Sequence, residues 1–289
     1  MLGKKPDWLK KRIKVDNTNI SEIRELIGGS NLNTVCQSAK CPNIFECYSR
    51  KTATFMLMGD RCTRNCTFCG VDTGKPLPLD KEEPVKIAQA VKKMGLRYVV
   101  LTSVTRDDLA DGGASHFAAT IREIKKKNED CYIECLIPDL KGDATDLETI
   151  LSEDITVLNH NLETISGNYA RVRPKASYKS SLDILKNAKR SRENIYTKTG
   201  FMLGLGENLS QIKKLLEDIR STGCDMVTIG QYLRPSASNT EVIKYYSPQE
   251  FREVGNLAEK MGLKAAVSGI FVRSSYHAAE LLDRIRMDS

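Results

Sequence analysis

The chain has 289 residues, 40% hydrophobic and 28% charged, which is ordinary globular composition and excludes a disordered or fibrous protein. No apolar stretch approaches the ~18 residues that span a membrane, so we expect no membrane partner. The net charge of +7 favours an acidic partner or an anionic cofactor. The lysines are dispersed, however, and no known nucleic-acid-binding motif would place them in a groove of DNA or RNA, so we expect no nucleic-acid partner.

The chain begins with a basic stretch, Met1 to Val15, that surrounds Pro6 and Trp8. It predicts a surface arm rather than a signal peptide, because it has no apolar central region. The cysteines that follow are expected to be reduced, since an oxidising compartment would pair them. These features predict a cytoplasmic protein.

Six of the nine cysteines lie between positions 36 and 69, in two groups of three. The first triad is Cys36, Cys41 and Cys47, and the second triad is Cys62, Cys66 and Cys69. Each group lacks the fourth ligand that closes a structural zinc site, whereas three thiolates can hold three corners of an iron–sulfur cluster and leave one iron free. The length and the odd cysteine count disfavour a disulfide framework. Two incomplete zinc sites, or one zinc site with spare thiols, are the alternative.

After the triads, short apolar strand patterns alternate with helical patterns. Strands are predicted at 52–58, 97–102, 131–137, 155–158, 195–203, 225–232 and 263–267. Helices are predicted at 84–94, 114–127, 146–151, 180–192, 209–221 and 248–261. This alternation predicts an α/β fold with a parallel sheet, and we expect a partial (βα)6 TIM-type barrel with N-terminal and C-terminal extensions. A doubly wound sheet is the competing fold, because periodicity does not give strand order.

The expected division of the chain is an N-terminal extension at 1–50, a barrel at 51–268 and a C-terminal segment at 269–289. The second triad follows the first predicted strand, and loops after barrel strands gather at the face where chemistry is done. Its cysteines should therefore open onto the barrel mouth. Polar or glycine-rich loops should surround the same point, at 102–105, 159–163 and 204–207.

The second triad, with Phe68 before its last cysteine and a predicted position after strand one of a partial barrel, resembles the radical S-adenosylmethionine (SAM) superfamily. With the first triad and the R-S-S-Y motif at 273–276, the chain is similar to the lipoyl synthase family. Other stretches that resemble this family are T-S-V-T-R-D-D-L from Thr102, D-G-G-A from Asp111, N-H-N-L-E-T from Asn159 and R-V-R-P from Arg171. The resemblance extends from about Cys36 to His277.

The resemblance implies that the second triad holds a [4Fe–4S] cluster whose free iron binds SAM. One electron, from a donor such as ferredoxin or flavodoxin, would then release a 5′-deoxyadenosyl radical. A radical is required because a saturated alkyl chain offers no acidic proton to a general base. The first triad would hold an auxiliary [4Fe–4S] cluster that is consumed as the sulfur source. Its fourth ligand would be Ser275, with Ser274 as the alternative; without the resemblance, both serines would be interpreted as caps of a helix near His277.

The implied substrate is an octanoyl chain on a lysine of a lipoyl carrier domain, which is a 2-oxoacid dehydrogenase E2 subunit or the glycine-cleavage H protein. Sulfur would enter at carbons six and eight. The catalytic residues that we predict are Cys62, Cys66, Cys69 and Ser275. The SAM contacts that we predict are Phe68, Thr102, Ser103, Asn159, Asn161, Glu163 and Arg173. An enzyme resembling biotin synthase and a non-catalytic zinc or electron-transfer module are the rival interpretations.

Other chemically tempting residues are expected to be structural. Core packing is expected for Cys131, Cys135 and Cys224. Asp107, Asp108 and Asp111 lack the alternation of a calcium-binding loop, so no calcium site is predicted.

Overall fold

A computed structural model describes residues 6–10, 17–50 and 52–287. Its main sheet has seven strands in the order β1-β4-β5-β6-β7-β8-β9, and all neighbouring strands are parallel. The strands are β1 (Thr54–Leu57), β4 (Tyr98–Ser103), β5 (Tyr132–Leu136), β6 (Val157–Asn159), β7 (Tyr196–Leu203), β8 (Met226–Gln231) and β9 (Ala265–Gly269). Strand order follows chain order without the reversal of a doubly wound sheet. The sheet is therefore the predicted partial barrel, open between β1 and β9.

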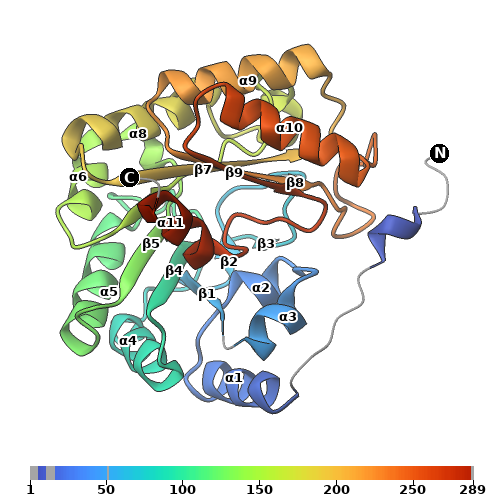
Figure 1. Ribbon diagram of the computed structural model, residues 1–289. Coiled ribbons are helices and arrows are strands. Elements are labelled where there is room, and N and C mark those ends of the chain that lie inside the picture. Colours follow the sequence, from blue (N-terminus) through green and yellow to red (C-terminus); the bar gives the residue numbers. More distant parts are fainter. Residues whose placement is uncertain (1–5, 11–16, 51, 288–289) are drawn as a thin grey trace.

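One long helix follows each of the first six strands (Figure 1). These helices are α4 (Glu83–Met94), α5 (Ala114–Lys127), α6 (Ala144–Leu151), α8 (Tyr178–Ser191), α9 (Leu209–Ser221) and α10 (Pro248–Lys260). Residues at the helix ends determine where several of these helices begin and stop. Asn208 and Ser247 form capping boxes with Gln211 and Glu250, and α4 stops where Gly95 adopts a φ of 65°.

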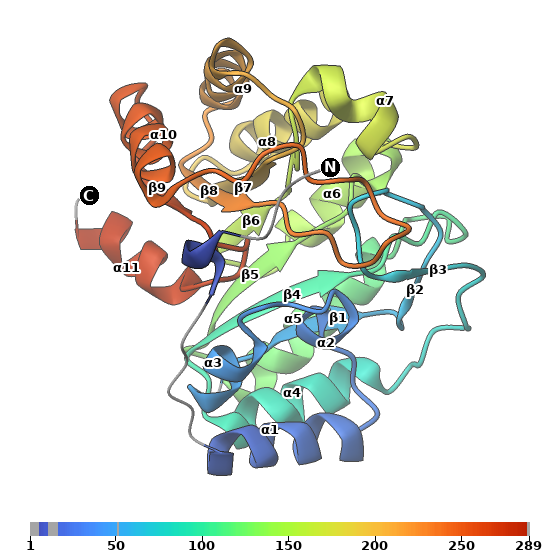
Figure 2. The same ribbon diagram turned by 90° about the vertical axis from the view of Figure 1, so that its right-hand side faces the viewer.

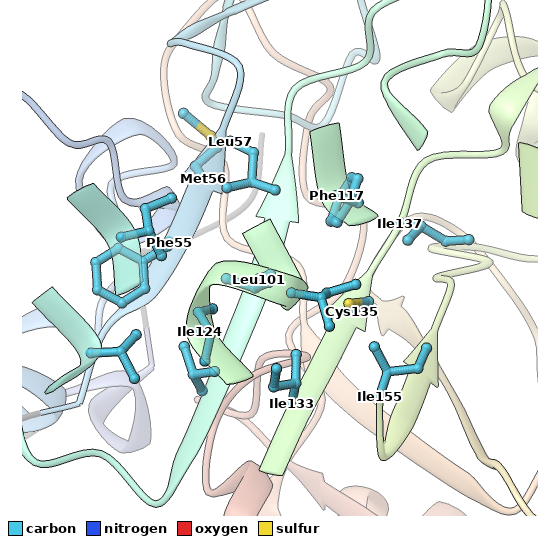
Figure 3. Close-up of a cluster of buried hydrophobic side chains, with 14 of the residues drawn as sticks. Phe55, Met56, Leu57, Leu101, Phe117, Ile124, Ile133, Cys135, Ile137 and Ile155 are labelled. Atoms are coloured by element: carbon cyan, nitrogen blue, oxygen red, sulfur yellow. The ribbon is translucent and has the colours of Figure 1, made fainter. Parts of the chain in front are cut away.

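Apolar side chains between the sheet and its helices form the core. Phe55, Leu101, Phe117, Ile133 and Cys135 are all fully buried in one cluster (Figure 3). Cys131 belongs to the same cluster, and Cys224 is buried in a second cluster on the β7–β8 side. The core role that was predicted for these three cysteines is confirmed.

The structure adds elements that the sequence patterns did not predict. In the N-terminal part these are η1 (Asp7–Leu9), α1 (Asn17–Gly29), α2 (Val35–Ser38) and α3 (Ile44–Ser49). Within the barrel they are the parallel pair β2 (Arg61–Cys62) and β3 (Asp72–Thr73), then η2 (Leu140–Gly142), η3 (Ser166–Asn168) and α7 (Tyr169–Val172). At the C-terminal end lies α11 (Ala278–Met287), which is the helix that the sequence placed near His277. Of the predicted basic arm, only residues 6–10 fall within the described residues, and Trp8 is 43% exposed there.

Helix α11 marks the end of the barrel that carries no cysteine triad. Its Leu281, Leu282 and Ile285 pack against buried residues of three strands, including Val157 and Met226. Figure 2 shows α11 and the β2–β3 pair at opposite ends of the sheet. No helix of the described ranges has the length and apolar character needed to cross a membrane.

Candidate active site

A cavity of about 470 Å³ lies at the carboxyl ends of the barrel strands. All six cysteines of the two triads line it, together with Ser275. The prediction that the second triad opens onto the barrel mouth is confirmed. The structure also brings the first triad, which precedes the barrel in sequence, to the same cavity.

The loop of the second triad is held by hydrogen bonds to its sulfur atoms. The backbone N–H groups of Arg64 and Thr105 each donate to Cys62 Sγ at 3.4 Å, and the N–H of Val71 donates to Cys69 Sγ at 3.4 Å. Such donors stabilise negative charge on sulfur, and around iron–sulfur clusters they help to set the reduction potential. The donor pattern fits a cluster whose ligands are thiolates.

Burial disfavours ionisation of two of these thiols. It raises the pKa of Cys69 to about 12, and the neighbouring Cys66 and Cys62 add to this effect. It also raises the pKa of Cys66, although Arg173 opposes the shift. Three thiolates in such a site would need a positive charge nearby, which the iron of a cluster would supply.

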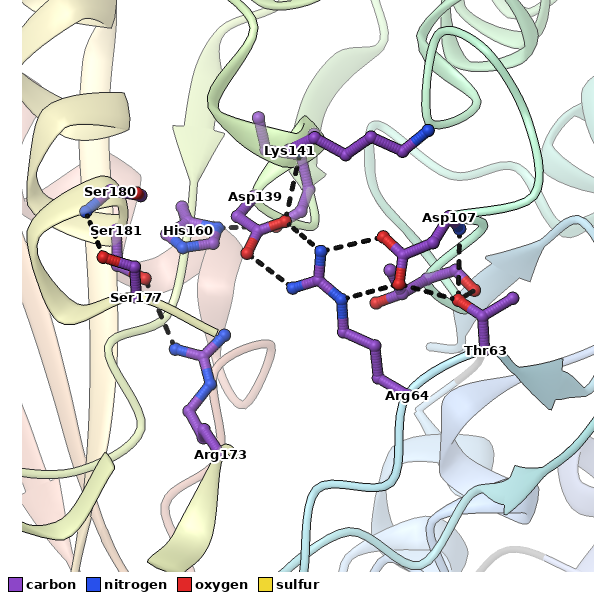
Figure 4. Close-up of polar contacts among 12 residues, drawn as sticks. Thr63, Arg64, Asp107, Asp139, Lys141, His160, Arg173, Ser177, Ser180 and Ser181 are labelled. Carbon is purple, nitrogen blue, oxygen red and sulfur yellow. Dashed lines mark hydrogen bonds and ion pairs between the residues drawn. The ribbon is translucent and has the colours of Figure 1, made fainter. Parts of the chain in front are cut away.

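Arg64 clamps the same loop to two neighbouring loops (Figure 4). Its guanidinium donates to Asp107, which follows β4, at 2.8 and 2.9 Å, and to Asp139, which follows β5, at 2.5 and 2.7 Å. Arg64 and Asp139 are buried. The second triad therefore sits on a loop fixed by charge-assisted hydrogen bonds from inside the fold.

The first triad lies under the C-terminal segment. Asn43 Nδ2 donates to the backbone oxygen of Phe271 at 2.7 Å, and the Tyr276 hydroxyl donates to Glu46 Oε1 at 3.0 Å. Burial, with Cys41 close by, raises the pKa of Cys36 to about 11. These contacts carry the R-S-S-Y motif to the side of the cavity that holds the first triad.

The two serines of that motif differ in their contacts. Ser274 Oγ accepts a hydrogen bond from Asn161 Nδ2 at 2.6 Å, whereas the Ser275 hydroxyl has no hydrogen-bond partner among the described residues. Neither hydroxyl accepts a bond from the first turn of α11 within the described residues, so the capping interpretation is not supported. Ser275 is the serine with a hydroxyl available for a ligand.

Most of the predicted SAM contacts line the cavity: Phe68, Thr102, Ser103, Asn161, Glu163 and Arg173. Four buried polar atoms of the lining lack a hydrogen-bond partner, namely Ser103 Oγ, His160 Nε2, Asn161 Oδ1 and Arg173 Nε. Buried polar atoms in native proteins are normally satisfied, so these four indicate a polar ligand. The lining thus fits SAM.

Asn159 was predicted as a SAM contact, but the structure places it outside the cavity lining. It does not line the cavity, because its side chain donates to Glu134 Oε1 at 2.8 Å in a buried cluster with Lys198. The adjacent His160, which was not predicted as a contact, lines the cavity instead. Neighbouring residues at a strand end point in different directions, and the polar run alone could not show which of them faces the ligand.

The His, Cys, Asp and Glu side chains do not gather around a single point in the described part of the chain. No group of three or more His, Cys, Asp or Glu side chains there could hold one metal ion. A cubane-type cluster spreads its three thiolates over three separate iron atoms. Asp107 and Asp108 pair with arginines, and Asp111 accepts hydrogen bonds from the backbone N–H groups at the start of α5.

Residues 56–219 match the family model described as the radical SAM superfamily. Two crystal structures share the fold, each with a TM-score of 0.59. Methylornithine synthase is 19% identical, and the match covers 73% of this chain and 62% of that chain. The maturase HydG of the [FeFe]-hydrogenase is 13% identical, with coverage of 72% and 49%. The chain therefore belongs to the radical SAM superfamily, which implies a [4Fe–4S] cluster and SAM as cofactors.

Relatives that match nearly the whole chain identify the family within this superfamily. The lipoyl synthase of Caldicellulosiruptor saccharolyticus is 53% identical, covering 97% of this chain and 98% of the relative. That of Chlorobaculum tepidum is 50% identical with coverage of 96% and 95%, and that of Rubrobacter xylanophilus is 49% identical with coverage of 98% and 88%. The chain is a member of the lipoyl synthase family, whose enzymes insert sulfur by radical SAM chemistry.

Proposed function

We propose that the second triad holds the SAM-binding [4Fe–4S] cluster and that the first triad, with Ser275 as fourth ligand, holds an auxiliary [4Fe–4S] cluster that supplies the sulfur. The observation that carries this proposal is that both triads and Ser275 line one cavity. An alkyl chain in that cavity is within reach of both sites. The proposal keeps the division of the chain into 1–50, 51–268 and 269–289.

The bound cofactors supply a carbon radical that removes hydrogen from an unactivated alkyl chain, and a source of sulfur for the resulting carbon. The protein's own residues provide position and exclude water. Apolar cavity residues suit an octanoyl chain, and among them are Met56, Val104, Leu136, Phe201 and Val272. The unpartnered polar atoms of Ser103, His160, Asn161 and Arg173 suit the polar groups of SAM.

His160 is suited to accept a hydrogen bond in this site. Burial, followed by the nearby Arg173, lowers the pKa of His160 to about 4, so the ring is neutral at pH 7. Its Nδ1 lies 2.9 Å from the backbone oxygen of Ile137, and a carbonyl oxygen only accepts, so Nδ1 carries the proton. His160 Nε2 therefore presents a lone pair to a donor group of the ligand.

Ser275 is suited to be the ligand that dissociates from the auxiliary cluster as sulfur is removed. An alkoxide is a harder donor than a thiolate and a poorer match for the iron of a cluster. The corner that Ser275 holds should open first as sulfur is withdrawn. The free hydroxyl of Ser275 and the engaged hydroxyl of Ser274 support Ser275 as the ligand.

The proposed substrate is an octanoyl-lysine of a lipoyl carrier domain, either a 2-oxoacid dehydrogenase E2 subunit or the glycine-cleavage H protein, with sulfur inserted at carbons six and eight. The proposed electron donor is ferredoxin or flavodoxin. The net charge of +7 supports attraction of acidic partners. A cytoplasmic location is also proposed, on the ground that iron must meet reduced thiols, and all nine cysteines are unpaired.

The test is an anaerobic incubation of the reconstituted protein with SAM, a reductant and either octanoyl-lysyl peptide or dethiobiotin. We expect about eight iron atoms per chain, formation of 5′-deoxyadenosine, and thiolation of the octanoyl peptide only. Conversion of dethiobiotin would favour an enzyme resembling biotin synthase. Bound zinc, with no 5′-deoxyadenosine, would indicate a non-catalytic module and contradict the proposal.

A further inference from the structure

Asn161 and Ser274 form a direct contact between the two sides of the cavity. Asn161 follows β6 and lies beside Glu163, which interacts electrostatically with Cys66 and Cys69 of the second triad. Ser274 precedes Ser275 in the C-terminal segment that lies over the first triad. The hydrogen bond from Asn161 Nδ2 to Ser274 Oγ, at 2.6 Å, therefore joins elements that serve different triads.

The contact leaves one atom of Asn161 for a ligand. Its Nδ2 donates to Ser274 Oγ and to Glu163 Oε1, at 3.0 Å, so both amide hydrogens are used. Its Oδ1 is buried in the cavity lining without a partner. A donor group of a bound molecule can satisfy that oxygen while the two other bonds stay in place.

The barrel makes room for this contact with a glycine. A Cβ on Gly200 of β7 would lie 2.9 Å from Asn161 Oδ1 and 3.2 Å from Ser274 Oγ. It would also lie 2.6 Å from Thr228 Oγ1. Any side chain at this position would push the contact apart. Arg273 provides a second connection between the same two sides, since it interacts electrostatically with both Cys41 and Glu163.

We propose that the Asn161–Ser274 hydrogen bond couples the two cluster sites. SAM, bound through a donor group at Asn161 Oδ1, fixes Asn161 and Ser274 and thereby holds the adjacent Ser275 on the auxiliary cluster. When SAM is absent, Ser275 is held less firmly and the auxiliary cluster gives up iron more readily. Asn161 and Ser274 are positioning residues in this scheme, which rests on the proposed function because it takes Ser275 as a ligand.

The test measures how fast a chelator removes iron from the anaerobically reconstituted protein, with and without SAM and with no reductant present. Mössbauer spectra assign the loss to one cluster or the other. In the wild type, SAM should slow iron loss from the auxiliary cluster about fivefold, the factor that corresponds to one net hydrogen bond. In Ser274→Ala, the rates with and without SAM should be equal. Ser274→Thr keeps a hydroxyl and should restore part of the difference.

Ser268→Ala is the matched control. Ser268, on β9, is a half-buried serine that donates to the backbone oxygen of Phe251 at 2.7 Å, outside the cavity lining. It should keep the SAM effect of the wild type. An undiminished SAM effect in Ser274→Ala, or no SAM effect in the wild type, would overturn the coupling while the proposed function stands. An iron content near four in the wild type would overturn the proposed function and the coupling together.

Discussion

At the scale of single residues, the ionisation of the cavity thiols depends on burial. Burial holds the pKa of Cys36 near 11 and that of Cys69 near 12, against an ordinary thiol pKa of ~8.5. Only the thiolate reacts with an alkylating agent or binds a metal. In the iron-free protein these two cysteines should therefore be nearly inert at neutral pH.

The corresponding prediction concerns alkylation of the iron-free protein by iodoacetamide. Because the thiolate fraction below the pKa rises tenfold with each pH unit, the rates at Cys36 and Cys69 should rise about tenfold per unit between pH 8 and pH 10. A thiol of ordinary pKa levels off above about pH 9. Peptide mapping by mass spectrometry over time gives the rate at each cysteine. A plateau below pH 9 at either residue would contradict the account.

Gly230 controls the position of the C-terminal segment. A Cβ there would lie 2.2 Å from the backbone oxygen of Val272, which cannot move without shifting the R-S-S-Y motif. Gly230→Ala should lower the free energy of unfolding by about 1–3 kcal/mol, as overpacking does. It should also reduce the reconstituted iron content from about eight toward four, because the auxiliary site is displaced.

Gly28→Ala is the matched control for this variant. Gly28 lies in α1, and no neighbouring atom falls within 4 Å of an added Cβ. Alanine should therefore be neutral or stabilise the helix, by at most about 1 kcal/mol, and the iron content should not change. Urea unfolding and iron analysis compare the two variants. Equal effects at Gly230 and Gly28 would refute a specific role of the Gly230 contact.

The place of the second triad at the cavity could be predicted from the sequence, because the triad follows the first strand of the barrel. Which polar residues line the cavity could be predicted only in part. Asn159, His160 and Asn161 are adjacent and all polar, yet only the last two line the cavity. The direction of each side chain is set by tertiary contacts, such as the bond of Asn159 to Glu134. Ser274 and Ser275 are likewise distinguished only by the partner that Asn161 provides.

At the scale of elements, the loop of the second triad depends on a buried ion pair. Burial opposes ionisation of Asp139, but its hydrogen bonds with Arg64 outweigh that effect and hold its pKa below the usual range. A carboxyl whose pKa is lowered on folding contributes stability above the pKa of the unfolded state. That contribution is lost as the pH falls through the folded pKa.

Arg64→Gln should therefore lower the free energy of unfolding at neutral pH, and should lower it less in acid. Removal of one partner of a buried pair costs about 3–5 kcal/mol. The loss should be complete at pH 7 and should shrink below about pH 4, where the Asp139 carboxyl of the unfolded chain binds a proton while the folded wild type still resists it. Urea unfolding of the iron-free variant and wild type at pH 7 and pH 3.5 measures it. A cost that is the same at both pH values would show that the ion pair is not its origin.

The strands and long helices were predictable because each strand is a short buried apolar run and each helix has an apolar face. The N-terminal helices α2 and α3 were not predictable in this way. They have four and six residues, too few to show a helical period, and they carry Cys36 and Cys47 of the first triad, with Cys41 between them. β2 and β3 have two residues each and are fixed by the triad loop. Tertiary contacts, not local pattern, determine these elements.

At the scale of the whole molecule, one end of the barrel is packed by a helix and the other end carries the candidate active site. Helix α11 packs against strand residues at one end, and the other end carries the cavity. The two extensions meet at that cavity, through the contacts of Asn43 with Phe271 and of Glu46 with Tyr276. The order of the chain around an open barrel thus lets a segment before the barrel and a segment after it complete one site.

The most direct test of the two-cluster account is an anaerobic single turnover with octanoyl-lysyl peptide, SAM and reductant, comparing the wild type with Cys36→Ala and Cys66→Ala. The wild type should form 5′-deoxyadenosine and thiolate the peptide. Cys36→Ala should still form 5′-deoxyadenosine but insert no sulfur, because only the auxiliary site is damaged. Cys66→Ala should do neither. Normal sulfur insertion by Cys36→Ala would contradict the account.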